Sequence, residues 1–144
     1  MPFRLESRVR YVDTDASGRI HYTAMLRHFE AAEIEFMRSL GLQMTWAEQD
    51  ALHVQFPRVR VDCTYTAPVR FDDLMRISVS VDQVGRSSYT LAFDAVVHET
   101  AVAQGRTVVV CVDTTTERSR PLPDALAAAL RRYQNEGMAE GADA

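Results

Sequence analysis

The chain of 144 residues has the size of one ordinary domain and is long enough to bury a hydrophobic core. Its 16 lysines and arginines and 20 aspartates and glutamates give a formal charge of −4, with both signs scattered, which argues against a nucleic-acid partner. No apolar run is long enough to span a bilayer, and the first residues lack the apolar segment of a secretory signal. We therefore expect a cytoplasmic protein without a membrane partner.

The first part of the chain predicts one strand and two helices. The strand is predicted because apolar residues occupy odd-numbered positions and would share one strand face: Phe3, Leu5, Val9 and Tyr11. Apolar residues then recur at helical spacing over residues 22–40, and Gly41 follows as a natural C-terminal cap. Residues 41–53 predict a turn and a short second helix, with Thr45 as its N-cap.

The rest of the chain alternates as β-structure and closes with a helix. Strands are predicted around residues 59–65, 77–81, 89–97 and 102–112, followed by a helix over 121–136 and a disordered tail over 137–144. Because only the antiparallel sheet can cover the apolar stripe of the long helix, we expect an α+β fold with the sheet curled around that helix, in a single domain of residues 1–136. Cys63 and Cys111 fall inside predicted strands and are expected to be small buried residues without a disulfide.

Two acids, Asp13 and Asp15, precede a glycine turn directly before the long helix. Their role could be structural, because an aspartate near a helix start accepts hydrogen bonds from free backbone amides. A calcium loop is a weaker alternative, because no glutamate stands at its twelfth position, so we expect no metal site. If the strand continues through this segment, both carboxylates lie on the same face and could act together.

A functional interpretation uses the free amides at the start of the helix. Such N–H groups polarise a carbonyl oxygen, and a carboxylate a few residues upstream could attack that carbonyl or activate water. If the helix begins near Tyr22, the amides of His21, Tyr22 and Thr23 can face a bound acyl carbonyl. Gly18 would let the chain approach the ligand closely.

These residues lead to a known family. The segments DTDASG at 13–18 and IHY at 20–22 resemble the 4-hydroxybenzoyl-CoA thioesterase family of hotdog-fold acyl-CoA thioesterases. The resemblance continues in YTAPV at 65–69 and GRSS at 85–88, so that it covers roughly residues 5 to 115. It implies a hotdog fold, hydrolysis of an acyl-CoA thioester with coenzyme A leaving, and no separate cofactor. It also implies active sites between the protomers of a homodimer, or of a homotetramer built from such dimers.

The resemblance also implies roles for single residues. Asp15 matches the catalytic aspartate of the family, which acts as nucleophile or general base, and the amide of Tyr22 would help to hold the carbonyl oxygen. Close relatives often carry a histidine where this chain has Tyr22. We therefore interpret His21 as a residue that lines the substrate pocket, and Gly18 and Thr23 as further substrate contacts.

Glu33 is a departure from that pattern, because many relatives have arginine at this position. It lies on the apolar face of the predicted helix, where a carboxylate is costly unless it is paired or faces a polar cavity. One alternative is an ion pair with an arginine from the sheet. The other is a role in the substrate pocket.

Coenzyme A carries phosphates, so its binding requires cations. Arg58 and Arg60 share a strand face, and the turn of Arg86, Ser87 and Ser88 could meet a phosphate; the alternatives are a soluble strand face and an ordinary hairpin. Further, weaker candidates are Arg118, Arg120, Arg131 and Arg132. Residues that could shape an acyl pocket, or alternatively pack in the core, are Trp46, His53, Phe56 and Tyr89.

Three functions remain open on the sequence alone. The first is an acyl-CoA thioesterase. The second is a thioesterase that acts on acyl carrier protein, for which arginines at the pocket mouth would supply a docking patch. The third is a non-catalytic protein that binds acyl-CoA. The pattern does not distinguish aryl from alkyl acyl groups.

Overall fold

The computed structural model describes residues 3–42 and 45–143; the side chains of Trp46 and of residues 137–143 lie outside this description. In chain order the elements are β1 (Phe3–Arg8), the 3-10 turn η1 (Tyr11–Asp13), α1 (Ala24–Ser39), α2 (Trp46–Leu52), β2 (Val54–Gln55), β3 (Arg58–Tyr65), β4 (Leu74–Val84), β5 (Ser88–Val97), β6 (Thr100–Val110), β7 (Val112–Asp113) and α3 (Asp124–Asp143).

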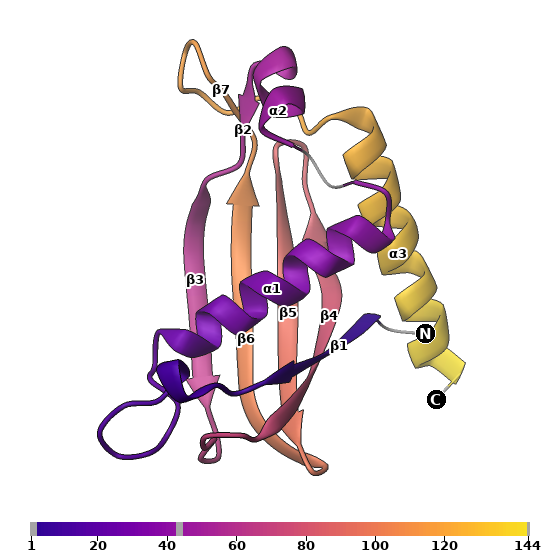
Figure 1. Ribbon diagram of the computed structural model, residues 1–144. Coiled ribbons are helices and arrows are strands. Elements are labelled where there is room, and N and C mark those ends of the chain that lie inside the picture. Colours follow the sequence, from indigo (N-terminus) through magenta and orange to yellow (C-terminus); the bar gives the residue numbers. More distant parts are fainter. Residues whose placement is uncertain (1–2, 43–44, 144) are drawn as a thin grey trace.

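Five strands form one antiparallel sheet in the order β1-β4-β5-β6-β3, and β2 pairs with β7 in a separate ribbon. The long helix α1 crosses one face of the large sheet, and α3 runs along the β4 side (Figure 1). The expected α+β architecture, a sheet wrapped around one long helix, is therefore confirmed. Within the described residues no helix has both the length and the apolar character needed to cross a membrane.

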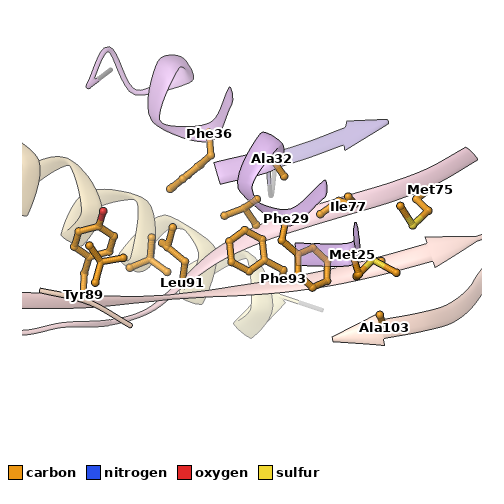
Figure 2. Packing of buried hydrophobic residues seen from close by; sticks show 14 of the residues in the cluster. Met25, Phe29, Ala32, Phe36, Met75, Ile77, Tyr89, Leu91, Phe93 and Ala103 are labelled. Atoms are coloured by element: carbon orange, nitrogen blue, oxygen red, sulfur yellow. The ribbon is translucent and has the colours of Figure 1, made fainter. Parts of the chain in front are cut away.

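The buried face of α1 is a single row of residues spaced by three or four positions. Met25, Phe29, Ala32 and Phe36 are at most 3% exposed and point into the sheet (Figure 2). This spacing places them one above the other on the helix surface. The ring of Phe29 stacks on Phe93 of β5, with the ring centroids 5.0 Å apart. This row holds α1 on the sheet.

Gly105 allows the closest approach of α1 to the sheet. A Cβ atom at this position of β6 would lie 2.6 Å from the Phe29 ring and 3.1 Å from the carbonyl oxygen of Asp62. The ring is buried against Phe93 and the carbonyl belongs to the neighbouring strand, so neither can move away easily. The absence of a side chain is therefore part of the helix-sheet contact.

The element ends differ in places from those that the sequence predicts. The predicted first strand ends at Arg8, and Tyr11, expected on its buried face, is 81% exposed in η1. The long helix begins at Ala24, two residues after the predicted start, and Tyr22 is 71% exposed instead of lying in the apolar stripe. The closing helix starts at Asp124 and runs to Asp143, into the range predicted as a tail.

The predicted helix caps are confirmed. Thr45 accepts a hydrogen bond from the Glu48 amide, and the Glu48 side chain accepts one from the Thr45 amide. Gly41 follows the C-terminal end of α1 with a φ of +72°, the left-handed conformation that favours glycine after a helix.

Both cysteines are free thiols. Cys111 is buried as predicted, and Cys63 is half-buried.

Strand β3 is a free edge of the sheet, because within residues 3–42 and 45–143 it pairs only with β6. It presents apolar side chains to solvent: Val59 is 61%, Val61 48% and Tyr65 41% exposed. Exposed edges with apolar residues are the places where sheets add a further strand.

Gly105→Ala is expected to lower the free energy of unfolding by about 1–3 kcal/mol, because the added methyl group overpacks the contact with Phe29. Urea denaturation followed by circular dichroism measures this change. Gly85→Ala is the matched control: its Cβ would meet only the Ser88 side chain at 3.3 Å and its carbonyl at 3.5 Å, so a much smaller loss is expected. Equal losses in the two variants would contradict the packing role of Gly105.

Candidate active site

Asp15 lies at the tip of a small hairpin that directly precedes α1. Thr14 and Ile20 form an isolated antiparallel bridge, and the Asp15 amide donates to the carbonyl of Arg19 at 3.0 Å. The turn closes with the Gly18 amide on the Asp15 carbonyl at 3.0 Å, and Gly18 adopts a φ of +80°. A non-glycine residue is strained at this φ, so Gly18 is required by the turn itself.

The carboxylate of Asp15 is exposed and stabilised by Ser17. Oδ1 accepts hydrogen bonds from the Ser17 hydroxyl at 2.5 Å and from the Ser17 amide at 2.8 Å. These two bonds, with smaller contributions from His21 and Arg19, lower the pKa of the Asp15 carboxyl. Asp15 is therefore ionised at neutral pH, the state that both a nucleophile and a general base need.

The three amides expected to face a ligand have different partners. The His21 amide donates to the Asp13 carbonyl at 2.7 Å, and the Thr23 amide donates to Nδ1 of His21 at 3.1 Å. Among the residues that the structure describes, no acceptor is paired with the Tyr22 amide. Of the three, only the Tyr22 N–H is available to a ligand in this conformation.

The side chains of His21 and Tyr22 lie together at the helix start. Their rings stack with centroids 4.6 Å apart, and Nδ1 of His21 lies 2.7 Å from the Thr23 hydroxyl. Because the Thr23 amide donates to Nδ1, this nitrogen is an acceptor and the ring hydrogen is on Nε2. His21 thus binds Thr23, the residue directly before the first turn of α1. The hydroxyl of Tyr65, a residue that we did not single out as a site residue, donates to the Tyr22 carbonyl.

Asp13 and Asp15 do not act as a pair. The strand ends before them, so Asp13 points into the protein and is 5% exposed, whereas Asp15 faces solvent. Burial alone would raise the pKa of Asp13, but hydrogen bonds from the Arg10 amide and from His28 outweigh it and lower the pKa. The expectation that both carboxylates share a face is wrong, because η1 turns the chain between Tyr11 and Asp13.

Glu33 is paired with a cation from the sheet, the first of the two alternatives. Its side chain is 6% exposed, and Oε1 accepts a hydrogen bond from the guanidinium of Arg58 at the start of β3. Burial raises the pKa of the Glu33 carboxyl, and Arg58 offsets part of this effect. Both residues also line a pocket, so the second alternative, a role in the substrate pocket, stays a prediction.

That pocket has a volume of about 710 Å³ and lies between the C-terminal half of α1, α2 and the start of α3. Tyr89 lines it beside Glu33 and Arg58. Its apolar wall is formed by Ile34, Met37, Leu42, Leu52, Phe56 and Leu126. Two of the residues that we expected to shape an acyl pocket, Phe56 and Tyr89, line this cavity. His53 lies outside the lining, and the side chain of Trp46 is outside the described residues.

The other candidate cations are only partly free. Arg60 forms an ion pair with Asp62 at 2.8 Å on the exposed side of β3. Arg86 is exposed in the turn before β5, and Arg131 of α3 donates to the neighbouring Gly85 carbonyl at 3.4 Å. The carbonyls of Ser87 and Ser88 accept backbone hydrogen bonds from Cys111 and Gly85, which holds this turn in place.

The strand register places the candidate residues at two opposite ends of the sheet. Arg58, Val109 and Tyr89 are aligned across β3, β6 and β5, next to the turn that carries Arg86. Tyr65, whose hydroxyl reaches the start of α1, stands at the other end of β3. At roughly 3.4 Å per residue the two ends of β3 are about 24 Å apart. Asp15 therefore does not line the 710 Å³ pocket of its own chain.

The sheet wrapped around one helix is a hotdog fold. The matching family and the curated relatives identify a thioester hydrolase, and the expectation of this class is confirmed. The family described as the Thioesterase-like superfamily matches residues 9–130, and the chain belongs to it.

Curated relatives and solved structures agree with this assignment. The acyl-CoA thioester hydrolase YbgC of Escherichia coli O6:H1 is 29% identical over 133 residues, 90% of this chain and 96% of that protein. The acyl-CoA thioesterase YbgC of Haemophilus influenzae is 32% identical over 114 residues, 77% of this chain and 81% of that protein. The crystal structure of a 1,4-dihydroxy-2-naphthoyl-CoA thioesterase from Synechocystis has a TM-score of 0.83 at 19% identity, covering 91% of this chain and 96% of that one.

Arg58→Met is expected to destabilise the protein more at pH 8 than at pH 5. Burial already raises the pKa of Glu33, and removal of Arg58 raises it further. Below the raised pKa the carboxyl carries a proton and its burial costs little; above it, the variant must bury an unpaired carboxylate. We expect a loss of about 1–3 kcal/mol at pH 8, because Arg58 is itself partly exposed, and a smaller loss at pH 5.

Urea denaturation at both pH values measures this difference. Arg60→Met is the matched control on the same strand, because its ion pair with Asp62 is exposed and its loss is expected to stay within about 0.5 kcal/mol at either pH. A loss for Arg58→Met that does not change with pH would show that Glu33 does not depend on Arg58 for its charge.

Proposed function

We propose that this protein is an acyl-CoA thioesterase in which Asp15 is the catalytic carboxylate and the Tyr22 amide polarises the thioester carbonyl. The observation that carries the proposal is the start of α1. An ionised carboxylate lies on a rigid turn a few residues before a helix, and the Tyr22 N–H there has no acceptor among the described residues. The positive end of the helix dipole adds to the stabilisation of a developing oxyanion.

We propose the nucleophilic route for Asp15, because the ionised carboxylate is the state that this route needs. A general base works best when its pKa is close to the working pH, whereas a carboxylate nucleophile needs only to be ionised. Asp15 would attack the thioester carbonyl, the C–S bond would break with its electron pair leaving on sulfur, and water would hydrolyse the mixed anhydride. A single turnover in ¹⁸O-labelled water tests this step, because label enters the Asp15 side chain only by the covalent route.

We further propose that the active unit is a homodimer, alone or as half of a homotetramer, in the cytoplasm. Antiparallel pairing of the free edge β3 with its own copy would extend the sheet and cover Val59 and Val61. With the strand centre on the twofold axis, Arg58 of one copy faces Tyr65 of the other. The pocket of one copy would then meet the start of α1 of the other. This arrangement accounts for the wide separation of Asp15 and the pocket within one chain.

In this dimer the 710 Å³ pocket, which Arg58 lines, would take the acyl group. Arg58 would face the coenzyme A phosphates together with arginines outside the lining, Arg60, Arg86 and Arg131. The same arginines support the alternative of an acyl-carrier-protein substrate, because carrier proteins are acidic partners. Hydrolysis rates on matched acyl-CoA and acyl-carrier substrates separate these two substrate classes.

Binding of acyl-CoA without release of thiol over hours would favour a non-catalytic role. A panel of aromatic, short-chain and long-chain acyl-CoAs identifies the acyl group.

Asp15→Asn is expected to lower kcat for acyl-CoA hydrolysis by about 10²–10⁴-fold without changing the fold or the oligomeric state, because the amide can neither attack nor accept a proton. Thiol release is measured with a chromogenic disulfide. Asp94→Asn, an exposed carboxylate on β5, is the matched control and should keep the activity of the unchanged protein. Near-full activity of Asp15→Asn would exclude Asp15 as the catalytic residue.

Val61→Asp is expected to weaken the dimer, because in this register residue 61 of each copy lies opposite Asp62 of the other, so the variant opposes two carboxylates and removes an apolar contact. We expect the dissociation constant of the dimer to rise about tenfold or more, equal to about 1.4 kcal/mol, with loss of hydrolysis at dilute protein concentrations. Light scattering coupled to gel filtration reports the mass. Ser80→Asp, on the exposed face of β4, should remain a dimer. A dimeric Val61→Asp protein would place the interface elsewhere.

A further inference from the structure

His28 is a buried polar residue of α1 that the proposed chemistry does not use. It is 8% exposed and stands beside the apolar row, one residue before Phe29. Its Nε2 lies 2.9 Å from Oδ2 of Asp13, and its Nδ1 lies 2.6 Å from the Ser7 hydroxyl. One continuous chain of hydrogen bonds therefore joins β1, α1 and the segment that leads to Asp15.

The charges fix the direction of these hydrogen bonds. The lowered pKa of Asp13 keeps it ionised at neutral pH, and a carboxylate can only accept hydrogen bonds. Nε2 of His28 must then carry hydrogen and donate to Asp13, and in the neutral ring Nδ1 accepts from Ser7. The same Oδ2 also accepts from the Arg10 amide at 2.8 Å. Both ring nitrogens of His28 and Oδ2 of Asp13 thus have partners, as burial requires.

Asp13 holds both arms of the hairpin that carries Asp15. Its carboxylate is bound to α1 through His28, and its carbonyl accepts the amide of His21, the residue next to Tyr22. The residue after it, Thr14, forms the bridge with Ile20 that closes the hairpin. The position of Asp15 relative to the Tyr22 amide therefore depends on where Asp13 is fixed.

The order Ser7, His28, Asp13 has the residue types of a hydrolase triad, but its location argues against direct catalysis. Ser7 is half-buried on the face of β1 that packs against α1. Neither the 710 Å³ pocket nor the smaller cavity near Gln83 touches any of the three residues. A substrate carbonyl thus has no described cavity from which to reach Ser7.

We propose that His28 is a positioning residue: through Asp13 it anchors the hairpin of residues 13–20 to α1, so that Asp15 and the Tyr22 amide keep the geometry that hydrolysis requires. The proposal rests on the proposed function, in which those two groups act on the thioester. A misplacement of a reacting group by about 1 Å can cost on the order of 100-fold in rate, so such an anchor affects kcat more than substrate binding.

His28→Phe and His28→Gln test the anchor. Phenylalanine keeps the ring but removes both hydrogen bonds, whereas the glutamine side-chain nitrogen can take the place of Nε2 and donate to Asp13. Phe36→Leu is the matched control: it loosens the apolar row at the far end of α1, where Phe36 contacts Tyr133, away from the hairpin. Each variant is assayed in its dimeric form for kcat, KM and melting temperature, and by hydrogen exchange of peptides that cover residues 13–23.

We expect His28→Phe to lower kcat about tenfold or more with KM within about twofold, and to speed exchange at residues 13–23. His28→Gln should recover most of kcat, and Phe36→Leu should lose a similar amount of stability without either effect. If His28→Phe does not fold, His28→Asn replaces it, because its shorter amide cannot reach Asp13. Unchanged kcat or unchanged exchange in the variant, or equal effects in Phe36→Leu, overturns the proposal.

The outcome is distinguishable from failure of the proposed function. If the unchanged protein releases no thiol from any acyl-CoA, or if Asp15→Asn is fully active, the proposed chemistry falls. The exchange measurement still decides whether His28 orders the hairpin, because it does not depend on turnover. If Asp15→Asn is inactive while His28→Phe retains full kcat, the chemistry stands and His28 is not a positioning residue.

Discussion

Phe29 occupies the space that Gly105 leaves open in β6 and stacks on Phe93, and this contact sets how closely α1 approaches the sheet. Met25 and Phe36 extend the contact toward the two ends of the helix. A helix held by one apolar row can neither rotate nor slide without opening cavities in the core, which is costly because interiors are close-packed. Each polar group on α1 therefore meets a fixed neighbour.

His28 and Glu33 flank this row on opposite sides of the helix. They are about 140° apart at roughly 100° per residue, and they reach opposite edges of the sheet, β1 through Ser7 and β3 through Arg58. Both are buried, so each needs a partner, and the partners can be met only with α1 in one register. The apolar row holds the helix on the sheet, and these two polar contacts add a second restraint on its rotation.

The position of α1 also explains why the candidate site is divided. The start of the helix, with Asp15 and Tyr22, lies at one end of β3, and the pocket with Arg58 lies at the other end. A helix that crosses a sheet diagonally cannot bring both ends together within one chain (Figure 1). In the proposed dimer the free edge of β3 resolves this separation, because a twofold axis reverses the strand and exchanges its ends.

The sequence by itself determined the order of the main elements, the helix caps, the turn that carries Asp15 and the need of Glu33 for a partner or a polar cavity, because these depend on residues close together in the chain. Only the tertiary structure decided that Arg58, 25 residues away, supplies the cation. It also buried Asp13 and left Asp15 exposed, and it paired Asp13 with His28 across 15 residues. Periodicity assigns a residue to a face, but the partner of a buried polar group is set by packing between elements distant in sequence, which no local pattern encodes.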